Sequence, residues 1–183
     1  LQKMNVKKFI NFSTVWTHYD GKEGNFFNLY SVYKQNFNNI INYYSKSLKK
    51  IKFFNLVISD TFGKDDKRKK LVNILKKNYK KNRSTSIISK NLSMNLLNVS
   101  DIVLAVDQIL RKNIKSGTYL LKNKKNFSVS KIIQKINRNL DKNIKIKWLS
   151  YKKIDEKLYN FNQLREWQPI NSNIQDIINI IKK

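Results

Sequence analysis

The sequence of 183 residues contains no cysteine and a single histidine, His18. Without thiols the chain has no disulfide framework, and one histidine is too few for the usual zinc sites. We therefore expect no metal centre. The apolar runs stay well below the roughly 20 residues that a bilayer-spanning helix needs. Residues 1–8 lack the apolar core and cleavage site of a signal peptide, so a soluble, cytoplasmic protein without a membrane partner is expected.

Glycine and proline are scarce as well, with four glycines and one proline in the whole chain. Nowhere does the sequence show a glycine-rich turn of the kind that joins a strand to a helix. A core-type strand is nevertheless predicted almost directly after Leu1. The sequence is therefore predicted to begin in the middle of a fold.

Acidic residues are few, with 12 against 38 basic residues and a net charge of +26. Such an excess favours a polyanionic partner such as RNA or the ribosome. Only five of the basic residues are arginine, the usual reader of base edges and clamp for phosphates. A/T-rich codons also encode Lys, Asn, Ile and Tyr, and these residues are abundant in the chain. Nucleic acid is therefore not the expected partner, and a basic RNA- or ribosome-associated protein without catalysis is kept as the alternative hypothesis.

The hydrophobic pattern predicts strands that alternate with helices. Short apolar runs predict strands, and apolar residues at helical spacing predict helices, the clearest of which begins at Asn28. Strands are expected at 8–14, 53–58, 92–99, 118–121 and 144–148, helices from residues 28, 71, 101, 129 and after Pro169, and a loop at 84–91. This order predicts an α/β protein with a largely parallel sheet, and the short strand-like runs count against a helical bundle.

Tyr30 and Lys34 are the residues whose spacing suggests chemistry. At positions i and i+4 of a helix their side chains lie on one face. A nearby ammonium group lowers a tyrosine pKa, so that the phenol can exchange a proton while a hydride moves on the adjacent carbon. Thr14 or Ser13, at the end of the preceding strand, could hold the substrate oxygen. The spacing alone is weak, because about one or two such pairs are expected by chance in this composition, and the alternative is a half-buried helix tyrosine beside a solvated lysine.

Five segments, in order along the chain, resemble the extended short-chain dehydrogenase/reductase family of NAD-dependent epimerases and dehydratases. They match the family's strand ending in Ser-Thr, its N-x-Y-x-x-x-K helix, its next strand and glycine turn, the segment before a late helix, and a Trp-x-Pro segment. These segments are Phe9–Thr14, Asn28–Lys34, Phe54–Gly63, Leu96–Ile102 and Leu164–Pro169. The resemblance implies the C-terminal portion of a Rossmann-like doubly wound parallel sheet with a small substrate-binding α/β subdomain, and NAD or NADP as cofactor.

Within that family, the motif sequences are similar to those of the CDP-abequose synthase group. The shared stretches are Ser13–Trp16, Asn28–Lys34, Asp60–Gly63 and Asp66–Leu71. The resemblance implies a nucleotide-diphosphate sugar as substrate, with reduction of a 4-keto sugar, epimerisation or dehydration left open. The choice between NAD and NADP is open too. Phe62, Lys64 and Glu166 depart from the family pattern, at turns and packing positions rather than at the proton chemistry.

The same resemblance implies roles for individual residues. Tyr30 is the expected acid and base, and Lys34 is expected to lower its pKa and to hold the nicotinamide ribose. Thr14 is expected to hydrogen-bond the reacting sugar oxygen, with Ser13 as second choice.

Further residues are expected to bind the substrate. Arg68 and Lys70 are assigned to the pyrophosphate, where an arginine fork suits paired phosphate oxygens, with a solvated loop as the alternative. The remaining candidates for the substrate site are Trp16, His18, Asn28, Asp60 and Thr61. A structural role for His18 is weighed equally. Asp101 is predicted to be a helix cap rather than a ligand.

The domain prediction follows from the resemblance. Residues 1–60 are expected to be the second half of the Rossmann-like domain, and 61–183 mainly the substrate-binding subdomain with one late return to the sheet. The family's G-x-x-G-x-x-G turn is absent, so the cofactor-binding N-terminal part is predicted to be missing, and this sequence alone should bind NAD(P) poorly. A homodimer through the Tyr30 helix is expected, and a family relative that only dimerises, without catalysis, is a third hypothesis.

Overall fold

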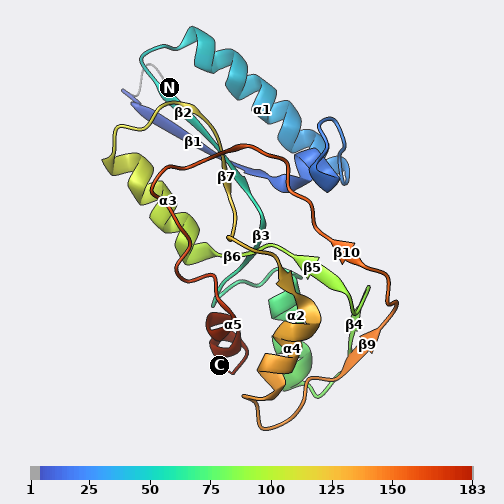
Figure 1. Cartoon of the computed structure of the whole chain (residues 1–183). Helices are drawn as coiled ribbons and strands as arrows, with labels where there is room; N and C mark the ends of the chain where they lie inside the picture. Colours follow the sequence, from blue (N-terminus) through green and yellow to red (C-terminus); the bar gives the residue numbers. More distant parts are fainter. Residues whose placement is uncertain (1–4, 183) are drawn as a thin grey trace. The chain divides into compact units, whose positions relative to one another are not determined.

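The structure, a computed structural model, describes residues 5–182 and is a mixed α/β protein built on parallel strands (Figure 1). It divides into two compact units. The first unit holds the described residues up to Ser59, together with Ile102–Leu121 and Lys157–Trp167. The second unit holds Asp60–Asp101, Lys122–Glu156 and the described part of the last segment, from Gln168.

The sheet of the first unit is fully parallel, with the strand order β1-β2-β7-β11. These strands are β1 (Lys8–Thr14), β2 (Lys52–Ile58), β7 (Gly117–Leu121) and β11 (Asn162–Gln163). The middle of β2 is buried on both faces, which explains its almost unbroken apolar run. Because the strands are parallel, their carboxyl ends share one edge, the edge at which open α/β sheets bind ligands.

Two helices and a short 3-10 segment complete the first unit. They are η2 (Val15–Gly21), α1 (Leu29–Ser47) and α3 (Val99–Arg111), whose residues from Ile102 belong to this unit. The Lys8 ammonium donates to the carbonyl oxygens of Ile109, Leu110 and Lys112, at 2.6, 2.7 and 3.2 Å. A cation there satisfies the free carbonyl groups at the end of a helix and complements its dipole.

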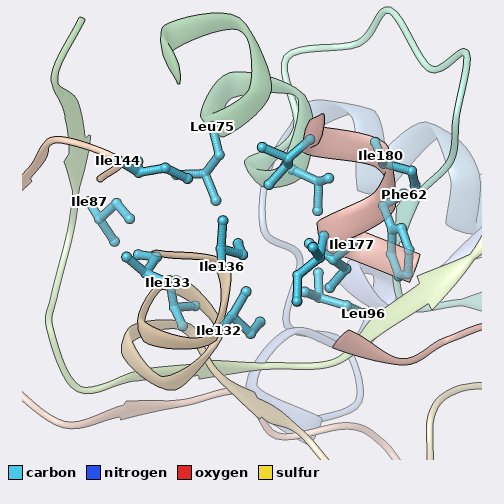
Figure 2. Packing of buried hydrophobic residues seen from close by; sticks show 14 residues of the cluster. Phe62, Leu75, Ile87, Leu96, Ile132, Ile133, Ile136, Ile144, Ile177 and Ile180 are labelled. Atoms are coloured by element: carbon cyan, nitrogen blue, oxygen red, sulfur yellow. The ribbon is translucent and has the colours of Figure 1, made fainter. Parts of the chain in front are cut away.

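The second unit consists of short strands around a core of isoleucine and leucine. Figure 2 shows side chains such as Leu75, Ile132 and Ile177 meeting in this core. Its helices are α2 (Leu71–Lys80), α4 (Val129–Asn137) and α5 (Ile174–Lys182), and its strands are β3 (Asp60–Phe62), β4 (Thr85–Ile87), β5 (Leu92–Met94), β6 (Leu96–Asn98), β8 (Phe127–Ser128), β9 (Ile146–Trp148) and β10 (Ile154–Asp155). The β5–β8 pair is antiparallel, whereas β3–β6, β4–β9 and β10–β5 are parallel.

Most predicted elements are confirmed, including β1, α1, β2, α2, β7, α4 with its Ser128 cap, β9 and α5. The predicted loop at 84–91 is wrong in part, because Thr85–Ile87 forms β4 and pairs with β9. The single strand predicted at 92–99 is two strands, separated at Asn95. The amide of Asn95 donates to Asn123 O and Asn126 Oδ1, both at 3.1 Å, so this residue belongs to a polar junction rather than to a continuous strand.

The start of α3 corrects the predicted cap. The helix begins at Val99, and Asn98 Oδ1 accepts a hydrogen bond from Ser100 N at 3.0 Å. Asp101 therefore lies inside the first turn and not before it. The prediction placed the cap too late, because the polar pair Ser100–Asp101 resembled a cap more closely than the asparagine that precedes it.

Asp101 instead anchors the segment that leads into α5. Its side chain is completely buried and accepts hydrogen bonds from Ile170 N (3.0 Å), Asn171 N (3.0 Å), Asn171 Nδ2 (3.0 Å) and Ser172 Oγ (2.5 Å). Carboxylate oxygens that accept several donors offset the cost of burying their charge. One helical carboxylate thus fixes the backbone of residues 170–172.

No helix within residues 5–182 is both long and apolar enough to cross a membrane. Across the same residues no cluster of His, Asp and Glu side chains could hold a metal ion.

After it leaves the first unit at Ser59, the chain returns to that unit twice, at Ile102–Leu121 and Lys157–Trp167. The sequence had suggested one late return, and the functional assignment of the two units stays a prediction.

Candidate functional site

The first turn of α1 sets the position of Tyr30. Asn28 Oδ1 accepts from Ser31 N at 3.1 Å, and Ser31 Oγ accepts from Asn28 N at 3.1 Å, which together form a capping box. This reciprocal pair fixes where the helix begins and so which way Tyr30 projects. Asn28 was predicted to contact substrate, and its carboxamide oxygen is used in this cap.

Lys34 connects α1 to the end of β1. Its Nζ donates to the carbonyl oxygen of Phe12 at 2.8 Å and lies 5.7 Å from the centroid of the Tyr30 ring. Tyr30 is 51% exposed, so the residue is not enclosed in the interior. An ammonium group has three donors, which leaves two of them for other partners. The phenol and the ammonium group thus share one open face beside the strand end.

The two hydroxyl groups at the end of β1 differ in their surroundings. Ser13 is buried, and its Oγ accepts from Asn38 Nδ2 at 3.0 Å. Thr14 is only partly buried, and its Oγ1 accepts a long hydrogen bond of 3.3 Å from Trp16 N as the cap of η2. Of the two, Thr14 is therefore the hydroxyl group that a ligand could reach, while Ser13 is held inside the fold.

A buried amide network supports this strand end and was not predicted. Asn11 Nδ2 donates to Asn55 Oδ1 at 2.8 Å and to Asn38 Oδ1 at 3.3 Å. Asn38 in turn donates to Ser13, so the network joins α1, β1 and β2. The feature of the sequence that could have indicated this network is Asn38, which shares one face of α1 with the buried Ile41. A polar residue on such a face needs buried partners, and only the fold shows which ones.

The aromatic candidates occupy two different settings. The Trp16 ring meets Tyr30 edge-on, with centroids 6.4 Å apart, and therefore lies beside the proposed acid and base. The ring of His18 is buried instead, 4.5 Å from Tyr159 and 4.8 Å from Phe161 between ring centroids. This packing favours the structural role for His18 over contact with a sugar.

The buried state of His18 predicts a pH dependence of stability. Burial lowers the pKa of His18 from 6.5, and the charge of Glu23 opposes the shift. The unfolded chain therefore binds the proton first, so the stabilisation from a neutral His18 is complete above the unfolded pKa of about 6.5 and is lost as the pH falls through and below it. We expect His18 to lower the free energy of unfolding between about pH 7.5 and pH 5, against an opposite contribution from Glu156, whose pKa is raised mainly by burial, and we expect His18→Gln to remove the His18 part of the slope.

Urea unfolding of both proteins at a series of pH values measures this slope. A second variant, Glu23→Gln, removes the opposing charge and should make the loss of stability at low pH larger. Equal slopes for the His18→Gln variant and the unchanged protein would contradict a buried, neutral His18.

The four predicted substrate residues of the second unit gather in one cluster. Arg68 binds the Asp66 carboxylate through Nε at 2.8 Å and Nη2 at 2.6 Å, and Nη2 also donates to Thr61 Oγ1 at 2.8 Å. Lys70 forms an ion pair with Asp60. The hydrogen bond from Arg68 is the main reason why the pKa of Asp66 lies below its ordinary value. Asp60 and Thr61 therefore serve to hold the two cations.

No protein-family model matches this chain, and no curated protein matches it. Solved structures do match over nearly all of its length. A UDP-N-acetylglucosamine 4-epimerase from Methanobrevibacter ruminantium, in complex with UDP-N-acetylmuramic acid, gives a TM-score of 0.81 at 16% identity and covers 99% of this chain and 64% of that chain. A dTDP-glucose 4,6-dehydratase from Bacillus anthracis, in complex with NAD, gives 0.75 at 18% identity, with 96% and 61% covered.

A third match is a UDP-glucuronic acid 4-epimerase from Bacillus cereus, in complex with UDP-glucuronic acid and NAD. Its TM-score is 0.76 at 18% identity, with 97% of this chain and 63% of that chain covered. This chain thus spans less than two thirds of the length of these three structures. The expected fold class is confirmed as a Rossmann-like α/β fold of the kind found in NAD-dependent nucleotide-sugar epimerases and dehydratases.

Proposed function

We propose that this chain carries the proton-transfer part of an NAD(P)-dependent enzyme that reduces or epimerises a nucleotide-diphosphate sugar. The observation that carries the proposal is the placement of Lys34, which donates to Phe12 O at the end of β1 and lies 5.7 Å from the Tyr30 ring. The Tyr30 ring and the Lys34 ammonium group therefore lie beside β1, whose last residue is the partly exposed Thr14. The fold shared with nucleotide-sugar enzymes supports the same reaction class.

The donor set fits the ribose end of a dinucleotide. Lys34 Nζ donates one hydrogen bond to Phe12 O, and its other two N–H groups can donate to ribose hydroxyl groups. The glycine-rich turn that holds a pyrophosphate is not among the 183 residues, so that end of the cofactor is not assigned to this chain. When bound, NAD or NADP supplies or accepts the hydride.

The side chains then have distinct tasks. Tyr30 gives a proton to the sugar oxygen as the carbonyl is reduced, or removes it in the reverse direction. The Lys34 ammonium stabilises negative charge that develops on the phenol oxygen, because opposite charges attract. Thr14 Oγ1 donates to the same sugar oxygen and orients it. Trp16, beside Tyr30, packs against the sugar ring.

Arg68 and Lys70 are proposed to meet the pyrophosphate of the substrate. Both cations already have carboxylate partners, Asp66 and Asp60, so part of their charge is compensated before a ligand binds. The Arg68 side chain is nevertheless more than half exposed, and a guanidinium group has five donors. A phosphate can therefore bind Arg68 while Asp66 stays in place.

The proposed activity is tested on a protein that includes any residues encoded upstream of Leu1. NAD(P)H oxidation is followed with a CDP-4-keto sugar, and interconversion is followed with UDP-glucose and UDP-glucuronic acid. Turnover of one of these substrates that depends on NAD(P) is the expected result. A protein that folds and dimerises but turns over none of them is instead the non-catalytic relative.

A homodimer through α1 is proposed on the exposed apolar side chains of that helix. They recur at helical spacing on one face and are Tyr33, Phe37, Ile40 and Tyr44. Such a contiguous stripe on a surface helix is typical of a protein interface. Val103, Leu104 and Leu110 of α3 are exposed as well, and they offer a second apolar helix face in the same unit.

Replacing Phe37 and Ile40 together by glutamate is expected to convert the dimer to a monomer. Two charges buried without partners at the interface strongly destabilise the dimer, because their lost hydration is not replaced. Light scattering coupled to size-exclusion chromatography measures the mass. Asn39→Glu, exposed on another face of α1, is the matched control and should stay dimeric. A double variant of unchanged mass would contradict this interface.

A further inference from the structure

A cavity of about 760 Å³ lies at the rim of the second unit, and all of its lining residues belong to that unit. Four of them are basic, Lys124, Lys125, Lys135 and Arg138. Its volume falls within the roughly 300–1,000 Å³ that small-molecule sites occupy. Neither the sequence pattern nor the proposed reaction assigns a role to this place.

The basic side chains of this cavity have no carboxylate partner within ion-pair distance among the described residues. None of its lining residues is acidic, and none of its four basic side chains forms an ion pair in the described part of the chain. Four like charges around one hollow repel each other and raise the local positive potential. An anion in the cavity relieves that repulsion.

Two other lysine-rich cavities provide a comparison. The one beside α2 contains Asp65 and Asp66, and its arginine is paired with Asp66. In the one near the start of β1, Lys8 donates to carbonyl oxygens of α3, and Lys52 binds Asn113. Their cations are therefore at least partly engaged by the protein itself. The cavity near the start of β1 also has no acidic lining residue, but it contains neither an arginine nor an aromatic side chain, so Arg138 beside Phe127 distinguishes the first cavity.

The walls of the cavity are held in place by the core. α4 begins at its Ser128 cap and buries Ile132, Ile133 and Ile136 against α2 and α5 (Figure 2), which leaves Lys135 at its exposed end. Across the hollow, the loop before β8 is fixed by Asn123, whose Nδ2 donates to Ser172 O at 2.5 Å. The cationic side chains thus extend from a backbone that is already ordered.

The cavity also has an apolar part. Phe127, Ile174 and Ile178 line it beside the cations. The amino end of α5 does not count toward anion binding, because Asn173 caps it and Asp176 occupies its first turn. The ligand that fits therefore needs several negative charges, and any organic portion that it carries can lie on Phe127 and Ile174.

We propose that this cavity binds a pyrophosphate group, with its phosphate oxygens on Lys124, Lys135 and Arg138. The Arg138 guanidinium binds two oxygens side by side, and the lysines add point charges. The group belongs either to a nucleoside diphosphate, whose base then packs on Phe127, or to inorganic pyrophosphate. This site is separate from the residues to which the substrate pyrophosphate is assigned, Arg68 and Lys70.

The test titrates the whole chain with sodium pyrophosphate and, separately, with ADP, by calorimetry and by amide chemical shifts. Binding is expected to shift the amide signals of Phe127 and Ile174. Lys135→Gln combined with Arg138→Gln is expected to weaken it by about tenfold or more, because the pair of substitutions removes two charged donors to the phosphate oxygens. Tighter binding of ADP assigns the organic part to the apolar wall, and equal affinities point to pyrophosphate alone.

The matched control removes the same charge elsewhere in the unit. Lys145→Gln with Lys147→Gln changes two exposed lysines that do not line the cavity, and it should bind like the unchanged chain. Arg68→Gln should bind like it as well. If the control weakens binding as much as the cavity variant does, or if the shifted amides surround Arg68 instead, the proposed site is wrong.

Discussion

Tyr30→Phe is expected to lower kcat by about 100- to 10,000-fold in the nucleotide-sugar reaction, the range that a positioned acid or base contributes. The ring is half exposed, and its edge-on contact with Trp16 needs no hydroxyl group, so the folded state should be unchanged. The KM for the sugar should change little, because the proton transfer is made in the transition state. Steady-state rates together with thermal unfolding separate these effects.

Two further variants make the Tyr30 result specific. Tyr33→Phe removes a hydroxyl group from an exposed position of the same helix that has no assigned part in the proton transfer, and it should leave kcat unchanged. Lys34→Met removes the ammonium group that binds Phe12 O and the proposed ribose, and should lower kcat and also raise the KM for the cofactor. A Tyr30→Phe enzyme with nearly full activity would overturn the proposed chemistry without touching the fold.

Asp101→Ala is expected to lower the free energy of unfolding by about 3 kcal/mol, since leaving a buried donor unsatisfied costs about 1–3 kcal/mol and water can reach some of these groups. The carboxylate is completely buried and accepts from the backbone of Ile170 and Asn171 and from the side chain of Ser172. Without it, the segment that leads into α5 loses the group that fixes its backbone. Urea unfolding with an unchanged m-value measures the effect.

Asp107→Ala is the matched control for Asp101. It lies on the same helix, and its carboxylate forms an exposed i, i+4 pair with Arg111, so we expect a change within about 0.5 kcal/mol. Asp101→Asn keeps the shape but loses charge and one acceptor, and should fall between the two. If Asp101→Ala is no less stable than Asp107→Ala, residues 170–172 do not depend on this anchor.

Local sequence was sufficient where neighbours in the chain decide the structure. The apolar run of β2 and the helical spacing of α1 were both readable because burial and periodicity act over a few residues. Thr85–Ile87 was missed because its partner, β9, lies far along the chain. A strand of three residues carries almost no pattern of its own, so its pairing is what creates it.

The candidate site shows the same division. Tyr30 and Lys34 were found from a spacing of four residues and from the order of surrounding motifs. That the Lys34 ammonium reaches the Phe12 carbonyl, and that Ser13 is held by Asn38 while Thr14 stays accessible, required the packing of α1 on β1. Likewise, no local pattern shows that Arg68 and Lys70 already have carboxylate partners.

By itself, the sequence determined the alternation of strands and helices, the position of the Tyr–Lys pair and the excess of positive charge, because each follows from residues close together in the chain. The tertiary structure alone decided which polar groups are buried together, such as Asn11 with Asn38 and Asp101 with residues 170–172. It also decided which basic side chains line the cavity beside α4 and α5, Lys124, Lys125, Lys135 and Arg138. Those outcomes depend on contacts between distant segments, whose geometry is set by the packing of the whole unit and not by any single stretch of it.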